Sequence, residues 1–456
     1  MTPVEDSKRP KHIPGSKPGL GGVTEPRTAA AHILADLRAG MMLEPAFEKR
    51  IVGLDARDRR WIQELVWGML RLRGWIDAVL AVRIRGGLAR LDADVTDLLR
   101  LGTYQLLFMG SVPPYAAIGQ TVELTKRRHG IGASKLANAV LRRVDREREE
   151  LEPPVPVDRI EAIAQKYSHP RWLVARWVER FGEADVVKLL VANNAEAPII
   201  VRPYGVVREQ LEAILEGAGV TVLDIPLLPD SLQLGSGVAL TELGAFKQGL
   251  FFVQDPGATL VARYAAVPQG AVVADLCAAP GGKSLEMSRT ASLVLAADRQ
   301  SVRVDRMLLG IGRVDAQNVM PIVADATAPA IRPVDVVLVD VPCTGTGTFR
   351  RHPDARWRLK ISDFAVMGTL QRSILRAAAA VVKPGGLLVY STCSLEPEEN
   401  DAQVDAFLSA HSDFTLEPPP PGTVPAAVLD NGRLRVLPQQ HGVDGAFAAR
   451  LRRKEA

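Results

Sequence analysis

Residues 275–283 read Asp-Leu-Cys-Ala-Ala-Pro-Gly-Gly-Lys, and this stretch decides the fold. It follows the apolar run 271–274 and comes before a segment with a helical pattern. Adjacent glycines let a backbone approach a ligand closely because no Cβ stands in the way. The stretch lacks the GxGxxG dinucleotide pattern, and Cys277 stands where a phosphate-binding loop needs its first glycine. We therefore predict a cofactor loop of another type, although glycine pairs also serve as simple turns.

Short apolar runs alternate with helical stretches from about residue 243 onward. The runs are 271–274, 293–296, 319–323, 334–339 and 387–390. Such alternation predicts an α/β fold, with a parallel sheet covered by helices on both faces. Ligands bind these sheets beyond the carboxyl ends of the strands.

Acidic residues end successive strands of this predicted sheet. Asp298 ends the second strand, where a carboxylate can accept hydrogen bonds from vicinal ribose hydroxyls. Asp325 ends the third strand, where it can receive an adenine amino group. Each acid alone is also explained as a helix N-cap, and for Asp325 the cap is the stronger explanation. Acids at successive strand ends favour an adenosine-type ligand.

Two cysteines each follow an apolar strand and lead into a polar loop. Cys343 closes Asp-Val-Pro-Cys (340–343), and Cys393 lies in Ser-Thr-Cys-Ser (391–394). A free cysteine is usually a small buried hydrophobe, as we expect for Cys277. A cysteine at the edge of a site can instead react as a thiolate. With three cysteines in the chain we expect no disulfide framework, and no Cys–His spacing predicts a metal site.

Basic side chains form two clusters. After Cys343 they surround Trp357, in a pattern that suits phosphate contacts with base stacking or, alternatively, a surface loop with salt bridges. This cluster contains Arg350, Arg351, His352, Arg356 and Arg358. The second cluster lies in a helical region and either contacts RNA or forms a solvated helix face, which we favour slightly for the run alone. It contains Lys126, Arg127, Arg128, Arg142 and Arg143.

The chain divides into four predicted segments. They are a disordered basic tail (1–25), a helical bundle (26–150), a proline-rich linker with a small α/β subdomain (151–240) and the α/β domain (241–456). In the small subdomain, strand-like runs at 199–201 and 220–223 flank a helical stretch at 209–216. The tail is either a dispensable extension, which we favour, or an RNA contact.

The overall composition is that of a folded protein. The chain has 456 residues, a hydrophobic fraction of 47% and a net charge of +4, which permits a polyanionic partner without identifying one. No apolar stretch reaches the length of a membrane span, and the N-terminus lacks the apolar core of a secretory signal. We expect a cytoplasmic protein without membrane contact.

These motifs together resemble the RNA 5-methylcytosine methyltransferase family of the Sun or Fmu type. The resemblance rests on residues 275–283, on VDVPCTGTGTFRRHPDARW (339–357) and on YSTCS (390–394). It extends to KLANAVLRR (135–143), which resembles the end of the family's NusB-like RNA-binding domain. Ser284 stands where threonine is frequent, and Gly-Ala-Phe (445–447) replaces the usual Gly-Phe-Phe.

The resemblance implies a Rossmann-like methyltransferase domain that uses S-adenosylmethionine to methylate carbon 5 of a cytosine in small-subunit ribosomal RNA. Cys393 is then the nucleophile, Cys343 assists release, and Asp340 contacts the base. The implied cofactor contacts are Cys277, Ala278, Ala279, Pro280, Gly281, Gly282, Lys283, Asp298, Asp325 and Asp340. The expected RNA contacts are Lys126, Arg127, Arg128, Arg142, Arg143, Arg350 and Arg351.

Other functions stay open at this point. The chain can be an RNA-binding factor with a decayed methyltransferase fold, although intact Asp340, Cys343 and Cys393 argue against decay. It can also act on another RNA such as tRNA, or on protein or small molecules. DNA cytosine methyltransferases use the Pro-Cys cysteine, and the presence of Cys393 argues against that class. We expect a monomer that binds no metal.

Overall fold

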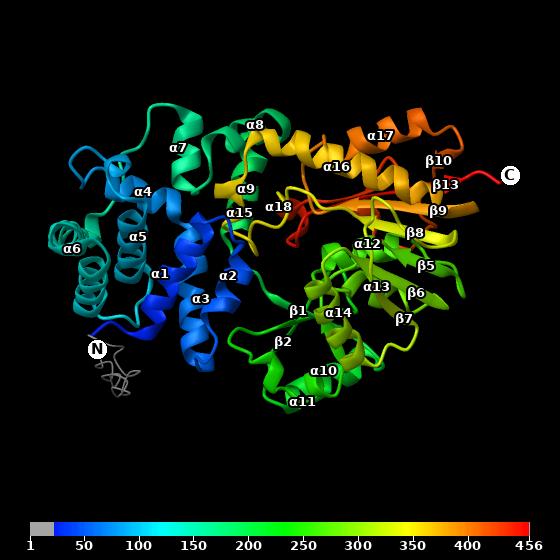
Figure 1. Cartoon of the computed structure of the whole chain (residues 1–456), viewed down its shortest axis with the longest axis horizontal. Coiled ribbons are helices and arrows are strands. Elements are labelled where there is room, and N and C mark those ends of the chain that lie inside the picture. Colours follow the sequence, from blue (N-terminus) through cyan, green and yellow to red (C-terminus); the bar gives the residue numbers. More distant parts are fainter. Residues whose placement is uncertain (1–21, 456) are drawn as a thin grey trace, which may run out of the picture. The chain divides into compact units, whose positions relative to one another are not determined.

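The computed structural model describes residues 22–455, which form two compact units (Figure 1). The first unit ends at Arg176 and the second begins at Trp177. Residues 1–21 of the predicted basic tail lie outside the described part of the chain, and the first helix begins at Glu25. Within residues 22–455, no helix is both long and apolar enough to cross a bilayer.

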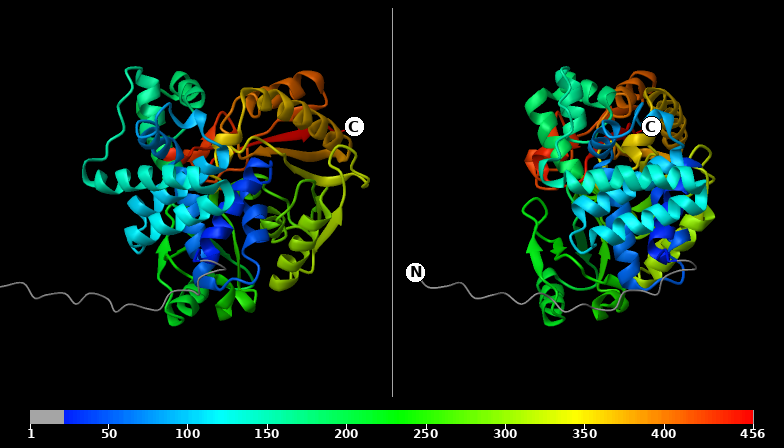
Figure 2. Two further views of the ribbon diagram at one scale, coloured as in Figure 1. Left: turned by 60° about the vertical axis from the view of Figure 1, so that its left-hand side comes forward. Right: turned by 90° about the vertical axis from the view of Figure 1, so that its left-hand side faces the viewer.

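The first unit is helical, which confirms the predicted bundle (Figure 2). Its α-helices up to the division are α1 (Glu25–Arg38), α2 (Leu43–Arg50), α3 (Ala56–Arg71), α4 (Arg73–Ala81), α5 (Ala93–Phe108), α6 (Pro114–Arg146) and α7 (Arg159–Lys166). Helix α6 is broken at Gly130, where φ is 81° and ψ is −175°. The basic run at 126–128 therefore ends the first half of α6, and Arg142 and Arg143 lie in the second half.

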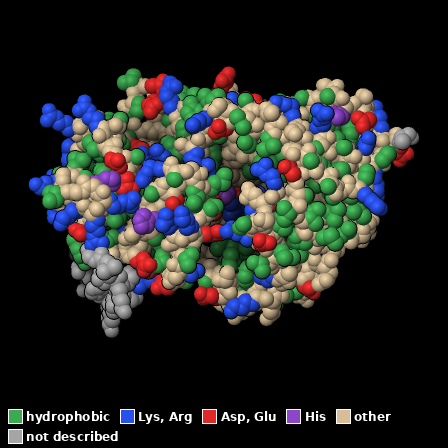
Figure 3. Space-filling model, viewed as in Figure 1, with side chains coloured by type: hydrophobic (Ala, Val, Ile, Leu, Met, Phe, Trp, Pro, Cys, Tyr) green, Lys and Arg blue, Asp and Glu red, His purple; other side chains and the backbone are tan. Residues whose placement is uncertain are grey.

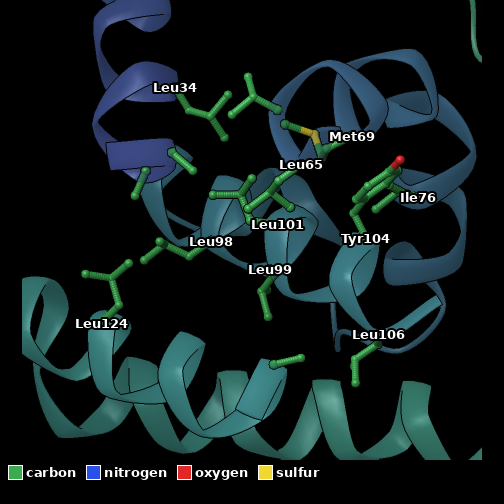
Figure 4. Close-up of a cluster of buried hydrophobic side chains, with 14 of the residues drawn as sticks. Leu34, Leu65, Met69, Ile76, Leu98, Leu99, Leu101, Tyr104, Leu106 and Leu124 are labelled. Atoms are coloured by element: carbon green, nitrogen blue, oxygen red, sulfur yellow. The ribbon is translucent and has the colours of Figure 1, made fainter. Parts of the chain in front are cut away.

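Helix α5 runs through the core of this unit. Leu98, Leu99 and Leu101 are buried and pack with apolar side chains of the neighbouring helices (Figure 4). The close approach of α3 and α5 depends on Gly68, because a Cβ at this position would lie 1.8 Å from the Tyr104 hydroxyl. Most residues of α5 are buried, as expected of a helix at the centre of a bundle.

The second unit begins with a small α/β part. After α8 (Arg171–Phe181), which contains the division, and α9 (Glu183–Asn194), four strands form an antiparallel sheet in the order β2-β3-β1-β4. The elements are β1 (Ile199–Pro203), α10 (Arg208–Gly217), β2 (Val222–Asp224), β3 (Leu232–Leu234), α11 (Gly244–Lys247) and β4 (Phe251–Val253). The predicted strands and helix are confirmed. The sheet takes its last strand from beyond residue 240, because β4 pairs with β1.

A nine-stranded sheet forms the rest of the described second unit, in the order β11-β12-β13-β9-β8-β5-β6-β7 with β10 beside β13. Strands β5 to β9 are parallel, as the alternating pattern predicted, and β10 to β13 add an antiparallel edge that was not predicted. The strands are β5 (Val272–Asp275), β6 (Leu293–Asp298), β7 (Val319–Val323), β8 (Val334–Asp340), β9 (Val382–Thr392), β10 (Phe414–Leu416), β11 (Leu429–Asp430), β12 (Arg433–Val436) and β13 (Ala446–Arg453).

Helices cover both faces of this sheet, so the α/β, Rossmann-like prediction is confirmed (Figure 1). Val336 and Leu338 of β8 pack toward α12 and α14, whereas Val337 and Val339 pack toward α16 and α17. The α-helices are α12 (Pro256–Tyr264), α13 (Gly282–Met287), α14 (Ser301–Val314), α15 (Ala355–Arg358), α16 (Ile361–Ala380), α17 (Asp401–Ala410) and α18 (Pro438–His441). Because successive residues of a strand face opposite sides, a strand buried on both faces is continuously apolar.

Candidate functional site

The sequence motifs meet at one edge of the large sheet. Strand β5 ends at Asp275, β6 at Asp298, β8 at Asp340 and β9 at Thr392. These strands are parallel, so their carboxyl ends lie at the same edge. The loop after β5 and the two cysteine loops therefore lie at the same edge of the sheet, as the sequence predicted.

The loop after β5 is held by its backbone. The Ala278 N–H donates to the Ala297 carbonyl at 2.7 Å, which ties the loop to the end of β6. Gly281 has φ 103°, in the left-handed region that favours glycine. A Cβ at Gly281 would also approach Met307 Cγ to 2.9 Å. The glycine is thus required both for the turn and for the packing of α14 against it.

Lys283 links this loop to the end of β8. Its Nζ lies 2.7 Å from Asp340 Oδ2, and Asp340 Oδ1 accepts a hydrogen bond of 2.8 Å from the Ser391 hydroxyl. Burial lowers the pKa of Lys283, but Asp340 and Asp275 more than offset this effect, and the pKa is raised. The ammonium is therefore charged, and it places a fixed positive charge beside the cysteine loops.

Asp275 is a buried carboxylate that sequence analysis quoted without assigning it a role. Its Oδ2 accepts a hydrogen bond of 2.7 Å from the Ser284 hydroxyl, while Oδ1 is buried without a hydrogen-bond partner among the described residues. Burial raises the pKa of Asp275 to about 7. Such an acceptor oxygen is suited to a donor or a cation supplied by a ligand.

Asp298 is buried at the end of β6. Its Oδ1 accepts from the Gln300 N–H at 3.0 Å, and Oδ2 lies 3.0 Å from Arg303 Nη1. Arg303 also donates to the Ala279 carbonyl at 2.7 Å, so it joins the predicted cofactor loop to this acid. The bond from the Gln300 N–H to Oδ1 is the one expected if Asp298 caps the following turn, so the cap explanation holds for one of the two oxygens.

Asp325 differs from Asp298 in exposure and in bonding. It is exposed, and its Oδ1 accepts from both the backbone N–H and the hydroxyl of Thr327, each at 2.8 Å. These bonds lower the pKa of Asp325. Its local bonds are those of the cap explanation, and its adenine contact stays a prediction.

The thiols of Cys343 and Cys393 are neighbours. Their Sγ atoms lie 3.2 Å apart, and both side chains are half-buried. The hydrogen bond from the Cys343 thiol lowers the pKa of Cys393, and Lys283 and His352 contribute in the same direction. That bond and burial raise the pKa of Cys343. Either sulfur can be the donor in this contact, and the lowered pKa of Cys393 favours it as the thiolate of the pair.

Cys277 has different surroundings. Burial, followed by the negative charge of Asp275, raises the pKa of Cys277 well above its ordinary value. The raised pKa favours a protonated thiol, in keeping with the expectation of a small hydrophobe. Cys277 packs against the core beside β5, and its predicted cofactor contact stays a prediction.

Sequence analysis missed Glu399, whose side chain is fully buried behind the two cysteine loops. Its carboxylate accepts hydrogen bonds from Thr344, Ser394 and Gln371. The available signal was the acidic run Glu-Pro-Glu-Glu-Asn (396–400) directly after the Cys393 motif. Nothing in that run distinguishes Glu399 from Glu396, which is also fully buried, or from Glu398, which is half-buried.

Arg350 and Arg351 lie in an ion-pair network. Both guanidinium groups are 2.7 Å from Asp255 Oδ2, and both lie 2.5 Å from Asp444. Arg350 is buried and Arg351 is half-buried. This placement gives them a role in joining distant segments of the second unit, while their predicted RNA contact stays a prediction.

The five residues of α6 that were predicted to contact RNA differ in their surroundings. Lys126, Arg127, Arg142 and Arg143 are exposed, whereas Arg128 is half-buried and donates to Asp94 at 2.8 Å. Figure 3 shows Lys and Arg side chains interspersed with Asp and Glu on the face of the helical unit that it draws. The four exposed residues can reach a phosphate, whereas Arg128 forms an ion pair with Asp94 inside the helical unit.

This edge of the sheet carries groups that suit the predicted adenosine-type ligand. Asp298 can hold a ribose, Asp275 Oδ1 has no partner among the described residues, and Gly281 and Gly282 bring the backbone close. Among residues 22–455 we find no cluster of His, Cys, Asp and Glu that could hold a metal ion.

Three family models match the chain. The 16S rRNA methyltransferase RsmB/F model matches residues 265–452 and covers the large sheet. The NusB family model matches residues 24–146 in the helical unit. The ferredoxin-like domain of RsmF/B-like methyltransferases matches residues 169–241.

Individual proteins are similar over nearly the whole chain. The ribosomal RNA small subunit methyltransferase B of Vibrio cholerae is 34% identical over 441 residues, which cover 95% of this chain and 98% of the relative. A probable ribosomal RNA small subunit methyltransferase B of Synechocystis sp. is 33% identical, with 88% and 92% covered. The crystal structure of PH0851 has a TM-score of 0.78 at 27% identity and covers 93% of this chain and 98% of that one. The chain therefore belongs to the RsmB/F family of 16S rRNA methyltransferases.

Proposed function

We propose that this protein methylates carbon 5 of a cytosine in small-subunit ribosomal RNA, with S-adenosylmethionine as the methyl donor. The carrying observation is the pair of thiols, Cys343 and Cys393, 3.2 Å apart at the strand ends that face Lys283 and Asp340. The names of the relatives support the substrate class, and the thiol pair supports the position on the base.

Carbon 5 of cytosine is a poor nucleophile, so the reaction needs covalent activation. The Cys393 thiolate adds to carbon 6, and the electrons of the 5,6 double bond make carbon 5 nucleophilic. Carbon 5 would then bond to the methyl group that S-adenosylmethionine supplies, and the methyl–sulfur bond would break with its electrons on sulfur, so that S-adenosylhomocysteine is the leaving group. After methyl transfer, the proton on carbon 5 passes to water, its bonding electrons restore the 5,6 double bond, and Cys393 leaves carbon 6 as a thiolate.

The neighbours of Cys393 serve two stages of this sequence. The Cys343 thiol donates a hydrogen bond to the thiolate, which stabilises it before attack and again as it departs. Asp340 lies at the same edge and is oriented by Lys283 and Ser391, so that it can hydrogen-bond the base and favour a protonated ring nitrogen during attack. A Cys343→Ala enzyme should therefore retain a covalent bond to RNA.

The cofactor is proposed to lie along the loop after β5. Asp298 would hold the ribose and Asp325 the adenine. Gly281 and Gly282 would let the loop backbone approach the cofactor closely. The helical NusB-family unit would contact RNA phosphates through its exposed cations on α6. Such a protein would act in the cytoplasm, where ribosomal RNA is made.

Two measurements test this function. Purified protein is incubated with methyl-labelled S-adenosylmethionine and separate RNA, DNA and protein fractions, and label is expected in RNA alone. Bisulfite sequencing of ribosomal RNA from a deletion strain should then show one cytosine that has lost its protection. Tight RNA binding without methyl incorporation would favour the alternative of an RNA-binding factor with a decayed methyltransferase fold. A modification lost from tRNA alone would show that the substrate is tRNA and not ribosomal RNA.

A further inference from the structure

Glu399 connects the two cysteine loops through one buried carboxylate. Its Oε1 accepts from the Thr344 N–H at 2.9 Å and from Gln371 Nε2 at 3.0 Å. Its Oε2 accepts from the hydroxyls of Thr344 and Ser394. Thr344 directly follows Cys343, and Ser394 directly follows Cys393. A single side chain therefore holds the residue after each thiol.

The same network also holds the residue before Cys343. Gln371, which is fully buried on α16, donates to the Pro342 carbonyl at 3.0 Å as well as to Glu399. The backbone on both sides of Cys343 is thus fixed, by Gln371 at Pro342 and by Glu399 at Thr344. No hydrogen bond of the described structure joins Glu399 to either sulfur itself.

Glu399 is in turn anchored to the strand that carries Cys393. The Tyr390 hydroxyl donates to the Glu399 carbonyl at 2.6 Å, and Tyr390 lies three residues before Cys393 at the end of β9. A second tie crosses between the loops, since the Gly347 N–H donates to the Cys393 carbonyl at 2.9 Å. A cysteine side chain has only one rotatable bond, Cα–Cβ, that places its sulfur. The positions of the two backbones, which this network fixes, therefore set the distance between the two Sγ atoms.

We propose that Glu399 is a positioning residue that holds the Cys343 thiol against Cys393 for the release of methylated RNA. This inference rests on the proposed function, in which Cys343 assists the departure of Cys393 from carbon 6. Attack by Cys393 proceeds without Cys343, whose hydrogen bond only lowers the pH at which the thiolate forms, whereas release needs both thiols side by side. The negative charge of Glu399 also helps to raise the pKa of Cys343, which keeps its thiol protonated as a donor.

The test compares covalent adduct formation with release in Glu399→Ala, Glu399→Gln and Cys343→Ala enzymes. The probe is labelled small-subunit ribosomal RNA transcript with S-adenosylmethionine, and adducts are resolved on denaturing gels over time. Glu398→Ala is the matched control, since it removes a carboxylate one residue away that takes no part in the four hydrogen bonds. Cofactor affinity and the melting temperature are measured for every variant.

At a pH where Cys393 is ionised in both the parent enzyme and the variant, Glu399→Ala should form the adduct at the normal rate and release it about tenfold to a hundredfold more slowly, as expected for loss of bonds to a charged acceptor. Glu399→Gln should lie between Glu399→Ala and the parent enzyme, because its amide oxygen can still accept from the Thr344 N–H. Cofactor affinity should not change. Release at the normal rate in Glu399→Ala would overturn the inference, as would an equal loss of attack and release in both variants.

Two milder variants decide the matter if Glu399→Ala does not fold. Thr344→Val and Ser394→Ala each remove one donor to the carboxylate and should each slow release while attack is retained. Normal release in both would overturn the inference. If Cys343→Ala itself accumulates no adduct while the parent enzyme methylates RNA, the division of labour in the proposed function fails, and the role of Glu399 fails with it.

Discussion

The Sγ atoms of Cys343 and Cys393 lie 3.2 Å apart although 50 residues separate them in the chain. Strands β8 and β9 are neighbours and run parallel, so each thiol follows its strand into the same edge of the sheet. At this separation one sulfur can donate to the other, and the pKa of Cys393 falls while that of Cys343 rises. The two thiols are therefore chemically unequal before any substrate binds.

This inequality predicts asymmetric effects of two alanine substitutions. Cys393→Ala should abolish both methylation and the covalent adduct, because no thiolate remains to attack carbon 6. Cys343→Ala should accumulate an adduct that survives denaturation, since attack proceeds and release is hindered. Denaturing gels with labelled RNA and S-adenosylmethionine should show a shifted band for Cys343→Ala alone. An adduct with Cys393→Ala and none with Cys343→Ala would reverse the roles and favour the mechanism of the DNA enzymes.

The pH dependence of thiol reactivity should follow the same hydrogen bond. Because the pKa of Cys393 is lowered, its thiolate persists to lower pH than an ordinary thiol. Alkylation by iodoacetamide, followed by peptide mass spectrometry, should show Cys393 reacting at lower pH than Cys277, whose pKa is raised by burial. Cys277 thus serves as an internal reference in every sample.

Removing the donor should reverse this shift. In Cys343→Ala the midpoint for alkylation of Cys393 should move to higher pH, since the hydrogen bond from Cys343 is the main cause of the lowering. Lys283→Met should shift it in the same direction through loss of the ammonium charge. An unchanged midpoint in Cys343→Ala would show that the thiols do not share a proton.

The sequence predicted the parallel core because β5 to β9 are short apolar runs, and a strand buried on both faces must be apolar. The same rule explains why β13 was missed. That strand carries Arg450, Arg452 and Arg453, and charged residues argue against a buried strand. Arg450 is nevertheless buried, because its guanidinium group pairs with Glu417 at 2.9 Å.

The sequence predicted where the motifs lie on the strands, but it did not predict which side chains from distant segments pair with one another. Arg350 and Arg351 resemble a phosphate-binding pair in sequence, yet they lie beside Asp255 and Asp444, both about 95 residues away. The role of Glu399 similarly depends on its hydrogen bond with Thr344, which lies 55 residues earlier in the chain. Side-chain pairings between remote segments depend on tertiary packing, which local patterns do not contain.

The cofactor proposal predicts unequal effects for the two strand-end acids. Asp298 is buried, and a charge-assisted hydrogen bond there contributes about 1.5–3 kcal/mol, so Asp298→Ala should weaken S-adenosylmethionine binding roughly tenfold to a hundredfold. Asp325→Ala should have a smaller effect, because that carboxylate is exposed and already bonded to Thr327. Isothermal calorimetry measures both, with Asp305→Ala on the exposed side of α14 as the control. Unchanged affinity in Asp298→Ala would remove Asp298 from the ribose site.

The cations of α6 should separate into a group that binds RNA and a residue that stabilises the fold. Replacing Lys126, Arg127, Arg142 and Arg143 with Gln should weaken binding to small-subunit ribosomal RNA. The slope of log affinity against log salt should fall by about 0.7 for each phosphate that the variant no longer neutralises. Arg57 and Arg60, exposed on α3, provide a control with the same substitution. An unaltered affinity and slope would identify the four cations as a solvated helix face.

Arg128→Gln should behave differently from those four. Arg128 donates to Asp94, a buried carboxylate that also pairs with Arg38 and His129. Its loss should lower the free energy of unfolding by about 1–2 kcal/mol, as expected for a hydrogen bond to a charged and mostly buried acceptor. Thermal melting should therefore shift downward while the salt slope of RNA binding stays unchanged. A lowered salt slope with an unchanged melting temperature would instead place Arg128 among the phosphate contacts.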